Sequence, residues 1–430
     1  MINRGKLTID LMWNYSSLVV LAASGILINV VIAASYGSSA LGVFNQVYAV
    51  YIMASQFAVG GLHFSSLKYT AEHEGQLELQ GRIFYSALFM AFIAGMGVSL
   101  LTYWSSDLIA GALNSAEVGK GLLLAAPALA FFSINKVLLA TLNGLRWMRA
   151  FAIGQALRYL LMIGYVIWAA ISEAPVYLLA GSFLFSELLL SILLLIMISP
   201  RFLPQHFTID WEWVVRHAMF GFKAFFSGVF VEVNSRVDIF MLGFFMNDRV
   251  VGLYSFAAML AEGFYHLLVV VRNILNPMLV QLIAGRKLEE LRFLVGKTQR
   301  IVYPGMLLVA LVIIGLFLPA IELFPNGDEF RDSFPVLIIL TTGFWLIAGF
   351  IPFDTILTQA GYPGRQSGMN AFGMSSNLIL NAILIPEFGA IGAAIATAGS
   401  FILATIYLNV LVHRRLGFTL CCLLSKKRLS

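Results

Sequence analysis

Charged residues are scarce in this chain of 430 residues, because Asp, Glu, Lys and Arg together make up only 11% of it. Apolar residues make up 60%, whereas a soluble domain has about 45–50% apolar and about 25% charged residues. A soluble core of this length cannot enclose that excess of apolar side chains, so lipid must solvate much of it. The composition therefore excludes an ordinary soluble domain and predicts an integral membrane protein.

Cysteine is nearly absent as well, since the chain has only Cys421 and Cys422. Two adjacent thiols in the C-terminal tail exclude a disulfide framework. We expect them to be unmodified, and acylation beside the membrane is the alternative. The net charge of +5 comes from basic residues dispersed through short polar segments, so no nucleic-acid partner is expected.

Motifs for catalysis, nucleotide binding and metal binding are also missing. Gly296-Lys297-Thr298 resembles the end of a phosphate-binding loop, but Leu291 stands where that loop requires its first glycine. The sequence contains no His-Glu-x-x-His, no Cys pair with metal spacing and no Gly-x-Ser-x-Gly. We therefore predict no catalytic residues, no metal site, no cofactor and no enzymatic activity.

Long apolar runs separated by polar breaks predict an all-α membrane protein with twelve transmembrane helices. Twenty-one of the 27 basic residues fall on one side of this arrangement and three on the other. The positive-inside rule then places both termini in the cytoplasm. The predicted spans are 11–35, 42–64, 83–104, 119–142, 150–171, 175–199, 220–246, 249–271, 301–323, 335–357, 366–386 and 389–412.

The sequence also repeats after about half its length. Leu41-Gly42-Val43-Phe44 and Val251-Gly252-Leu253-Tyr254 each follow a short polar turn and begin a predicted span. Six spans in each half give the halves the same orientation, and parallel halves around a central cavity are typical of transporters. We predict a six-helix bundle with a cytoplasmic linker over 1–210 and a second bundle with a cytoplasmic tail over 211–430.

Cations inside the predicted spans indicate where a substrate would bind, because ionisable groups in lipid are costly and usually face a cavity or a partner. We predict Arg236, Arg158, Lys136 and Asn234 as substrate-binding residues. At about 100° per residue, the polar residues around Asn234 and Arg236 cover about half the circumference of the span 220–246. The alternatives are that Arg236 pairs with Glu232, and that Lys136 and Arg158 snorkel to the cytoplasmic interface.

Carboxylates at the same depth are candidates for coupling transport to an ion. We predict this role for Asp238, Glu187, Glu262 and Glu232, because a buried acid that binds H⁺ or Na⁺ can shift a conformational equilibrium. Hydrogen bonding between helices is the alternative for Glu187 and Glu262. Asp354 is a further ionisable residue within a predicted span.

Three segments carry a resemblance to a known superfamily. They are Leu41–His73, Arg236–Glu262 and Pro386–Ser400, the last reading PEFGAIGAAIATAGS. Together with the span count and the repeat, they resemble the polysaccharide transporter branch of the multidrug/oligosaccharidyl-lipid/polysaccharide exporter superfamily, and within it the O-antigen flippases.

The resemblance implies two six-helix bundles around a central cavity that opens alternately to each side. It implies transport of undecaprenyl-diphosphate-linked oligosaccharide from the inner to the outer leaflet of a bacterial inner membrane. Membrane lipid, a polysaccharide polymerase and a chain-length regulator are the partners it suggests. A cation-coupled exporter of small molecules is the alternative, although the acid often found inside the first helix of drug exporters is missing after Asp10. A membrane polymerase or ligase is disfavoured because no large outer loop is predicted.

The topology can be tested with single cysteines in a background that carries Cys421→Ser and Cys422→Ser. A cysteine at Asn326 should react in intact cells with a membrane-impermeant thiol reagent, because the segment 324–334 is predicted to lie outside. Cysteines at Gln76 and Gly285 should react only after the cells are opened. Labelling of Gln76→Cys in intact cells would contradict the predicted orientation.

Overall fold

The computed structural model of the chain describes residues 4–202, 207–323 and 325–420. It also leaves undescribed the side chains of residues 4–11, 14, 15, 226–228, 230 and 231. Cys421 and Cys422 lie outside the described residues. Within the described ranges all regular structure is helical and no strand occurs, which confirms the predicted all-α class.

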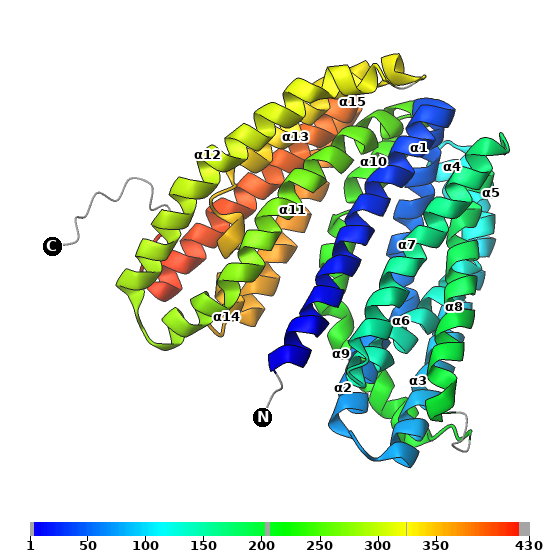
Figure 1. Cartoon of the computed structure of the whole chain (residues 1–430). Coiled ribbons are helices and arrows are strands. Elements are labelled where there is room, and N and C mark those ends of the chain that lie inside the picture. Colours follow the sequence, from blue (N-terminus) through cyan, green and yellow to red (C-terminus); the bar gives the residue numbers. More distant parts are fainter. Residues whose placement is uncertain (1–3, 203–206, 324, 421–430) are drawn as a thin grey trace. The chain divides into compact units, whose positions relative to one another are not determined.

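The helices follow one another with short connections (Figure 1). The α-helices are α1 (Arg4–Val59), α2 (Leu62–Glu72), α3 (Leu77–Trp104), α4 (Ser106–Ala112), α5 (Ala116–Ala125), α6 (Ala128–Gly144), α7 (Met148–Ile171), α8 (Gly181–Phe202), α9 (Trp211–Asn234), α10 (Val237–Phe245), α11 (Asp248–Ala284), α12 (Leu288–Ile321), α13 (Phe334–Leu346), α14 (Ile356–Gln359) and α15 (Pro363–Leu416). Three 3₁₀ helices, η1 (Val176–Ala180), η2 (Gly327–Ser333) and η3 (Ile351–Phe353), lie between them.

Seven of the described helices are long and apolar enough to cross a membrane, and the number rises to nine if each of two bent helix pairs is one span. Their outward faces carry the apolar excess of the composition. On α12, Leu308, Leu311 and Leu316 recur at helical spacing and are all exposed. An apolar helical face without protein cover requires lipid as its solvent. The chain is therefore a multi-pass membrane protein.

Two of the long helices are interrupted by a glycine. Gly37 in α1 has φ 80° and ψ −173°, and Gly389 in α15 has φ 55° and ψ −129°. Side chains with a Cβ rarely adopt a positive φ, so glycine is the residue that allows the chain to change direction here. The predicted spans 11–35 and 42–64 fall on the two sides of Gly37, and 366–386 and 389–412 meet at Gly389. In Figure 1 the dark-blue arm of α1 rises from the N-terminus and the chain then turns back.

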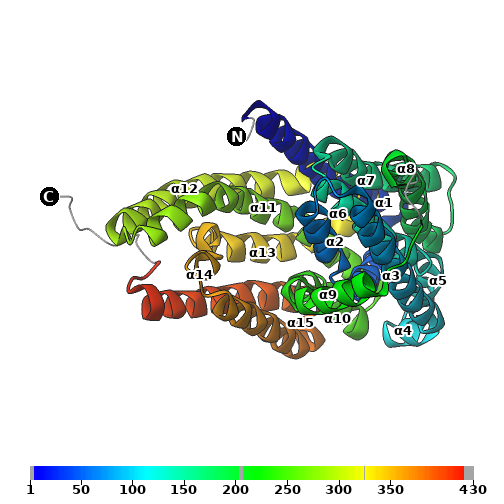
Figure 2. The same cartoon turned by 90° about the horizontal axis from the view of Figure 1, so that it is seen from below.

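Contacts divide the chain into two compact units, residues 1–249 and 250–430. In the first unit α6 packs against α2, α3 and α8, and α7 packs against α1 and α8 (Figure 2). Large apolar side chains of α3, α6 and α8 fill its core, and the Phe84 and Phe202 rings stack with centroids 4.4 Å apart. This core fixes the spacing of the helices that carry the predicted cations Lys136 and Arg158.

Helix α9 lies against the break between α1 and α2. A Cβ added to Gly221 would come within 2.7 Å of the Gly60 carbonyl oxygen, so the two backbones are in direct contact. On the next turns, the Ser65 hydroxyl lies 2.7 Å from Nδ1 of His217, and the His217 ring is fully buried. The contact holds the start of α9 on the first unit, and the chain continues from there toward Arg236.

The second unit packs α13 against α12 and α15, and α14 against α15. Its core includes the fully buried Leu279, Leu291, Phe353 and Leu357. Between η2–α13 and η3–α14 the chain bends by 51°. After this bend, the polar residues Asp354 and Thr355 lie in the turn between η3 and α14.

The unit boundary at 249/250 differs from the bundle boundary predicted at 210/211. The difference concerns α9 and α10, which pack against α1, α2 and α3 in the first unit. Compact units follow contacts, whereas the predicted bundles follow the sequence repeat. The division into bundles over 1–210 and 211–430 therefore stays a prediction.

Candidate substrate-binding site

The predicted continuous span 220–246 is broken at the residues that were expected to bind substrate. Helix α9 ends at Asn234, and α10 begins at Val237 with Arg236 as its N-cap residue at φ −122° and ψ −4°. No proline or glycine causes this break. The Ser235 hydroxyl donates a 2.7 Å hydrogen bond to the Glu232 carbonyl, as expected where the helical hydrogen bonds end.

Arg236 lies at this break with its guanidinium carbon 5.0 Å from the centroid of the Tyr48 ring of α1. The side chain is half-buried, and the Asn234 side-chain oxygen beside it is buried without a hydrogen-bond partner among the described residues. Glu232 is exposed. The break thus combines a cation and an amide at a point where the backbone also leaves helical geometry.

Arg158 of α7 and Glu187 of α8 form an ion pair inside the first unit. Nε of Arg158 lies 2.7 Å from Oε1 of Glu187, and Nη2 of Arg158 donates to Oε2 over 3.2 Å. Only 6% of Arg158 and 2% of Glu187 is exposed. In this structure Glu187 thus has the kind of interhelical partner that was the alternative to an ion-coupling role. The pairing also means that Arg158 is enclosed by protein and does not snorkel to the interface.

Neighbouring polar groups complete the coordination of the Glu187 carboxylate. The Asn135 amide of α6 donates to Oε2 over 2.7 Å and to the Glu187 carbonyl over 2.8 Å. The Ser191 hydroxyl then donates to the Asn135 oxygen over 2.8 Å. A buried ion pair is tolerated when hydrogen bonds satisfy its remaining atoms. This network therefore joins α6, α7 and α8 at membrane depth.

Lys136, the residue after Asn135, has no acidic partner within 4 Å among the described residues. Its ammonium lies 5.3 Å from the centre of the Phe132 ring, and the Arg158 guanidinium carbon lies 4.9 Å from the same ring. Lys136 is half-buried. Glu187 already pairs with Arg158. Of the two cations next to the Phe132 ring, Lys136 is therefore the one that can still bind an anion.

An aromatic row connects the two ends of the site. The Phe183 ring of α8 stacks on Tyr48 at 5.7 Å and on Tyr51 at 4.9 Å, and Tyr51 meets Phe132 edge-on at 5.8 Å. Arg236 lies over Tyr48 at one end of the row, while Lys136 and Arg158 lie over Phe132 at the other. The structure thus brings Arg236, Arg158 and Lys136 together along one aromatic row, which the sequence analysis did not identify.

The predicted acids are distributed over both units. Asp238 is buried in the first turn of α10 and Glu187 in α8, whereas the half-buried Glu262 belongs to α11 in the second unit. In the second unit Asp354 pairs with Arg272, whose Nη1 lies 2.7 Å from Oδ2. Arg272 was missed because the predicted span ended at residue 271.

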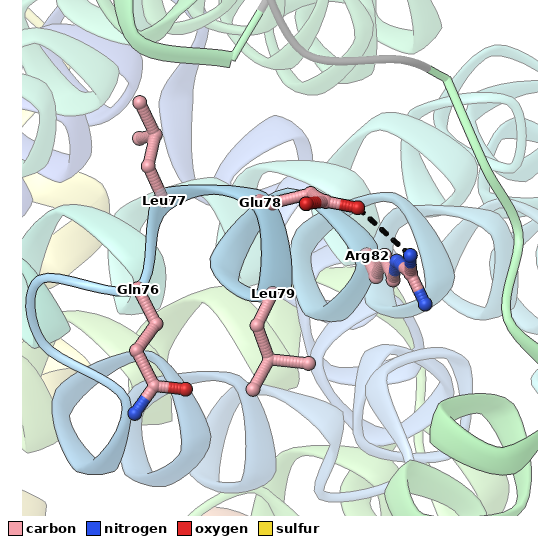
Figure 3. A pocket seen from close by; sticks show the side chains of 5 residues that line it. All are labelled: Gln76, Leu77, Glu78, Leu79 and Arg82. Atoms are coloured by element: carbon pink, nitrogen blue, oxygen red, sulfur yellow. Dashed lines mark hydrogen bonds and ion pairs between the residues drawn. The ribbon is translucent and has the colours of Figure 1, made fainter.

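The surface depression at the start of α3 is separate from these buried charges. Gln76, Leu77, Glu78, Leu79 and Arg82 line it, and Arg82 donates a 2.8 Å hydrogen bond to Glu78 (Figure 3). All but the half-buried Leu79 are exposed, and none was predicted to bind substrate. Within the described part of the chain, no cluster of three or more His, Cys, Asp or Glu could hold a metal ion.

Comparison with solved structures defines the class of this fold. The chain aligns with the lipid II flippase MurJ in an inward closed conformation at a TM-score of 0.73 and 18% identity, over 94% of this chain and 87% of that one. It aligns with an inward-facing multidrug resistance MATE transporter of the MOP superfamily at a TM-score of 0.76 and 13% identity, over 93% and 94% of the two chains. The chain therefore has the all-helical fold of MOP superfamily transporters.

The sequence places it more narrowly. Residues 76–320 match the polysaccharide biosynthesis protein family, and the chain belongs to that family. Two relatives from Haloferax volcanii are a probable low-salt glycan biosynthesis flippase, Agl15, and a probable flippase, AglR. They are 28% identical over 174 residues and 29% identical over 180 residues, and each match covers 40% of this chain and 36% of the relative. Flippases are transporters rather than enzymes, in agreement with the prediction of a non-enzyme.

The buried network makes a prediction about stability. Glu187→Ala leaves the Arg158 guanidinium buried without its anion and removes an acceptor from Asn135, so we expect a loss of about 3–5 kcal/mol of folding free energy. The measurement is thermal unfolding of purified protein in detergent. The double variant Arg158→Leu/Glu187→Leu should regain most of the loss, because it removes both charges.

The exposed Lys120–Glu117 pair, with 2.7 Å between Nζ and Oε1, is a matched control. Water already solvates both of its groups, so Glu117→Ala should leave the unfolding temperature nearly unchanged. An unchanged unfolding temperature in Glu187→Ala would show that the buried pair does not hold α7 and α8 together.

Proposed function

We propose that this protein is a flippase that moves a lipid-linked glycan across the membrane by alternating access. The observation that carries the proposal is the pair of half-buried cations Arg236 and Lys136 at the two ends of the aromatic row. A diphosphate between lipid and sugar is anionic, and guanidinium and ammonium groups bind phosphate oxygens strongly in a low-dielectric site. The flippase names of the sequence relatives support the same function.

The substrate we propose is undecaprenyl-diphosphate-linked oligosaccharide, an O-antigen unit or a similar polysaccharide repeat. It would move from the inner to the outer leaflet of a bacterial inner membrane, with both termini of the protein in the cytoplasm. The resemblance to O-antigen flippases supports this choice, and so does the excess of basic residues on one side. A polysaccharide polymerase and a chain-length regulator would act with the flippase.

We further propose twelve transmembrane helices in two bundles. The nine spans counted with the bent pairs become eleven when α1 and α15 are each divided at their glycine. The broken pair α9 and α10 supplies the twelfth. An even number of spans agrees with the sequence repeat.

Within the site we assign separate roles to the predicted residues. Arg236 and Lys136 hold the diphosphate, and Asn234 donates from the break in the helix. Arg158, enclosed with Glu187, positions the Phe132 ring and adds positive potential. Asp238, Glu187, Glu262 and Glu232 were the predicted ion-coupling acids, and Glu187 is the weakest of these because both of its carboxylate oxygens are engaged.

A cation-coupled exporter of small molecules is the second candidate, because the fold is shared with a multidrug resistance transporter. Such an exporter would need an acidic site for cationic drugs. The half-buried charges on the aromatic row are positive, and this favours an anionic substrate.

The proposal predicts that Arg236→Ala abolishes transport while the protein level stays normal. Arg236→Lys should keep part of the activity, because a point charge still attracts phosphate without binding it bidentately. The measurement is the amount of surface polysaccharide made in cells whose own copy of the gene is deleted. Arg82→Ala, which removes an exposed guanidinium from the α3 depression, should leave that amount near the wild-type level.

The competing role of Arg236 is an ion pair with Glu232. If the diphosphate is the partner of Arg236, Glu232→Ala will not rescue Arg236→Ala. Full recovery of transport in the double variant would contradict the diphosphate role and leave a structural pair.

A further inference from the structure

Two arginine–carboxylate pairs of the described residues, Arg158–Glu187 in the first unit and Arg272–Asp354 in the second, differ in how the carboxylate is satisfied. Both oxygens of Glu187 are engaged, by Arg158 and by Asn135. Asp354 has its Oδ2 on Nη1 of Arg272 at 2.7 Å, while its Oδ1 is buried with no hydrogen-bond partner among the described residues. A buried carboxylate oxygen that accepts no hydrogen bond is costly.

A second buried acceptor oxygen belongs to Gln366, whose side chain is hydrogen-bonded to the backbone of Asp354. The Gln366 amide of α15 donates to the Asp354 carbonyl over 3.0 Å and to the Asn370 side-chain oxygen over 3.4 Å. Its own Oε1 is buried with no described partner, and only 9% of Gln366 is exposed. Two neighbouring residues therefore each present a buried acceptor oxygen, and neither oxygen receives a donor.

We propose that Asp354 is a proton-binding site of the second unit, with the proton carried on Oδ1. This inference rests on the proposed transport function, for which it supplies the coupling ion. The proton adds to the carboxylate to give a neutral acid whose O–H is a new donor, on a residue whose backbone carbonyl already accepts from Gln366. The site adds a residue to the four acids that the sequence analysis selected.

Among the described residues, the charged and titratable neighbours of Asp354 come from one element. They are Arg272 and Tyr265, both of α11. Helix α15 contributes the neutral side chains Gln366 and Asn370, and the core around Phe353 is apolar. Because the Arg272 guanidinium already occupies Oδ2, a metal cation at Oδ1 would be repelled, whereas a proton removes the negative charge altogether.

Protonation of Asp354 removes the negative charge that compensates the Arg272 guanidinium. A neutral Asp354 leaves the guanidinium without its anion, and an uncompensated charge at this depth must find water or another anion. The Arg272 side chain is 22% exposed and that of Asp354 is 26% exposed, so water can reach the pair with little rearrangement. Asp354 lies after the 51° bend, in the short turn between η3 and α14, where helix geometry is already interrupted. Proton binding would therefore favour an arrangement of the second unit in which Arg272 is more hydrated.

The experiment is infrared difference spectroscopy of the purified full-length protein in lipid, without any substrate. On acidification from mildly alkaline to mildly acidic buffer, wild type should gain a C=O band of a protonated carboxylic acid. Asp354→Asn should lack that band. Asp328→Asn, which removes a carboxylate that is 91% exposed, should keep it.

The variant Arg272→Gln is the control for misfolding. Misfolding could remove the C=O band from Asp354→Asn, whereas Arg272→Gln should make the band appear at higher pH. Without its cation the carboxylate is protonated more easily, so the band should already be present in mildly alkaline buffer. The inference is overturned if Asp354→Asn retains the wild-type band. It is also overturned if Na⁺ at constant pH removes the band from wild type, because the site then binds a metal cation.

These outcomes are separate from the proposed function, since the spectra require no transport. A chain that moves no glycan but shows the Asp354 band would refute the flippase proposal and keep the proton site. A chain that moves glycan without that band would refute the proton site alone.

Discussion

The bilayer offers a buried charge neither water nor counterions, and the rest of this structure depends on that constraint. Arg158 meets it by pairing with Glu187, and Arg272 meets it by pairing with Asp354. Each pair joins two different helices or turns. The Arg158–Glu187 pair joins α7 to α8, and Asn135 extends the network to α6.

The same constraint separates the charge that is paired inside the first unit from the charges that we propose to act on a substrate. Arg158 is paired with Glu187 and enclosed, whereas Lys136 is half-buried, lies over the Phe132 ring and has no acid within 4 Å among the described residues. Arg236 lies at a helix break beside a buried amide oxygen that has no partner. In the function that we propose, the diphosphate of the substrate is the anion that these two cations attract.

The sequence was sufficient for the parts of the fold that follow from periodicity and composition. The all-α class and the apolar spans could be predicted, because lipid requires long apolar helices. The conformations of Gly37 and Gly389, where two of those span boundaries fall, were not predicted. The break at Arg236 could not be predicted, since no proline or glycine marks it. The pairing of Arg158 with Glu187 was open for another reason, because only packing brings α7 and α8 into register. The aromatic row was missed because Tyr48, Tyr51, Phe132 and Phe183 are ordinary membrane residues until tertiary structure aligns them.

The central claim is that this chain moves a lipid diphosphate that carries a sugar, and a reconstituted assay tests it most directly. Purified protein is placed in vesicles with undecaprenyl-diphosphate-linked oligosaccharide in both leaflets. An impermeant glycosidase added outside then reports the fraction of glycan that reaches the outer leaflet. Our account predicts that this fraction rises toward the whole pool in wild-type vesicles and remains at the outer-leaflet share in vesicles without protein. Equal fractions in the two preparations would contradict the account.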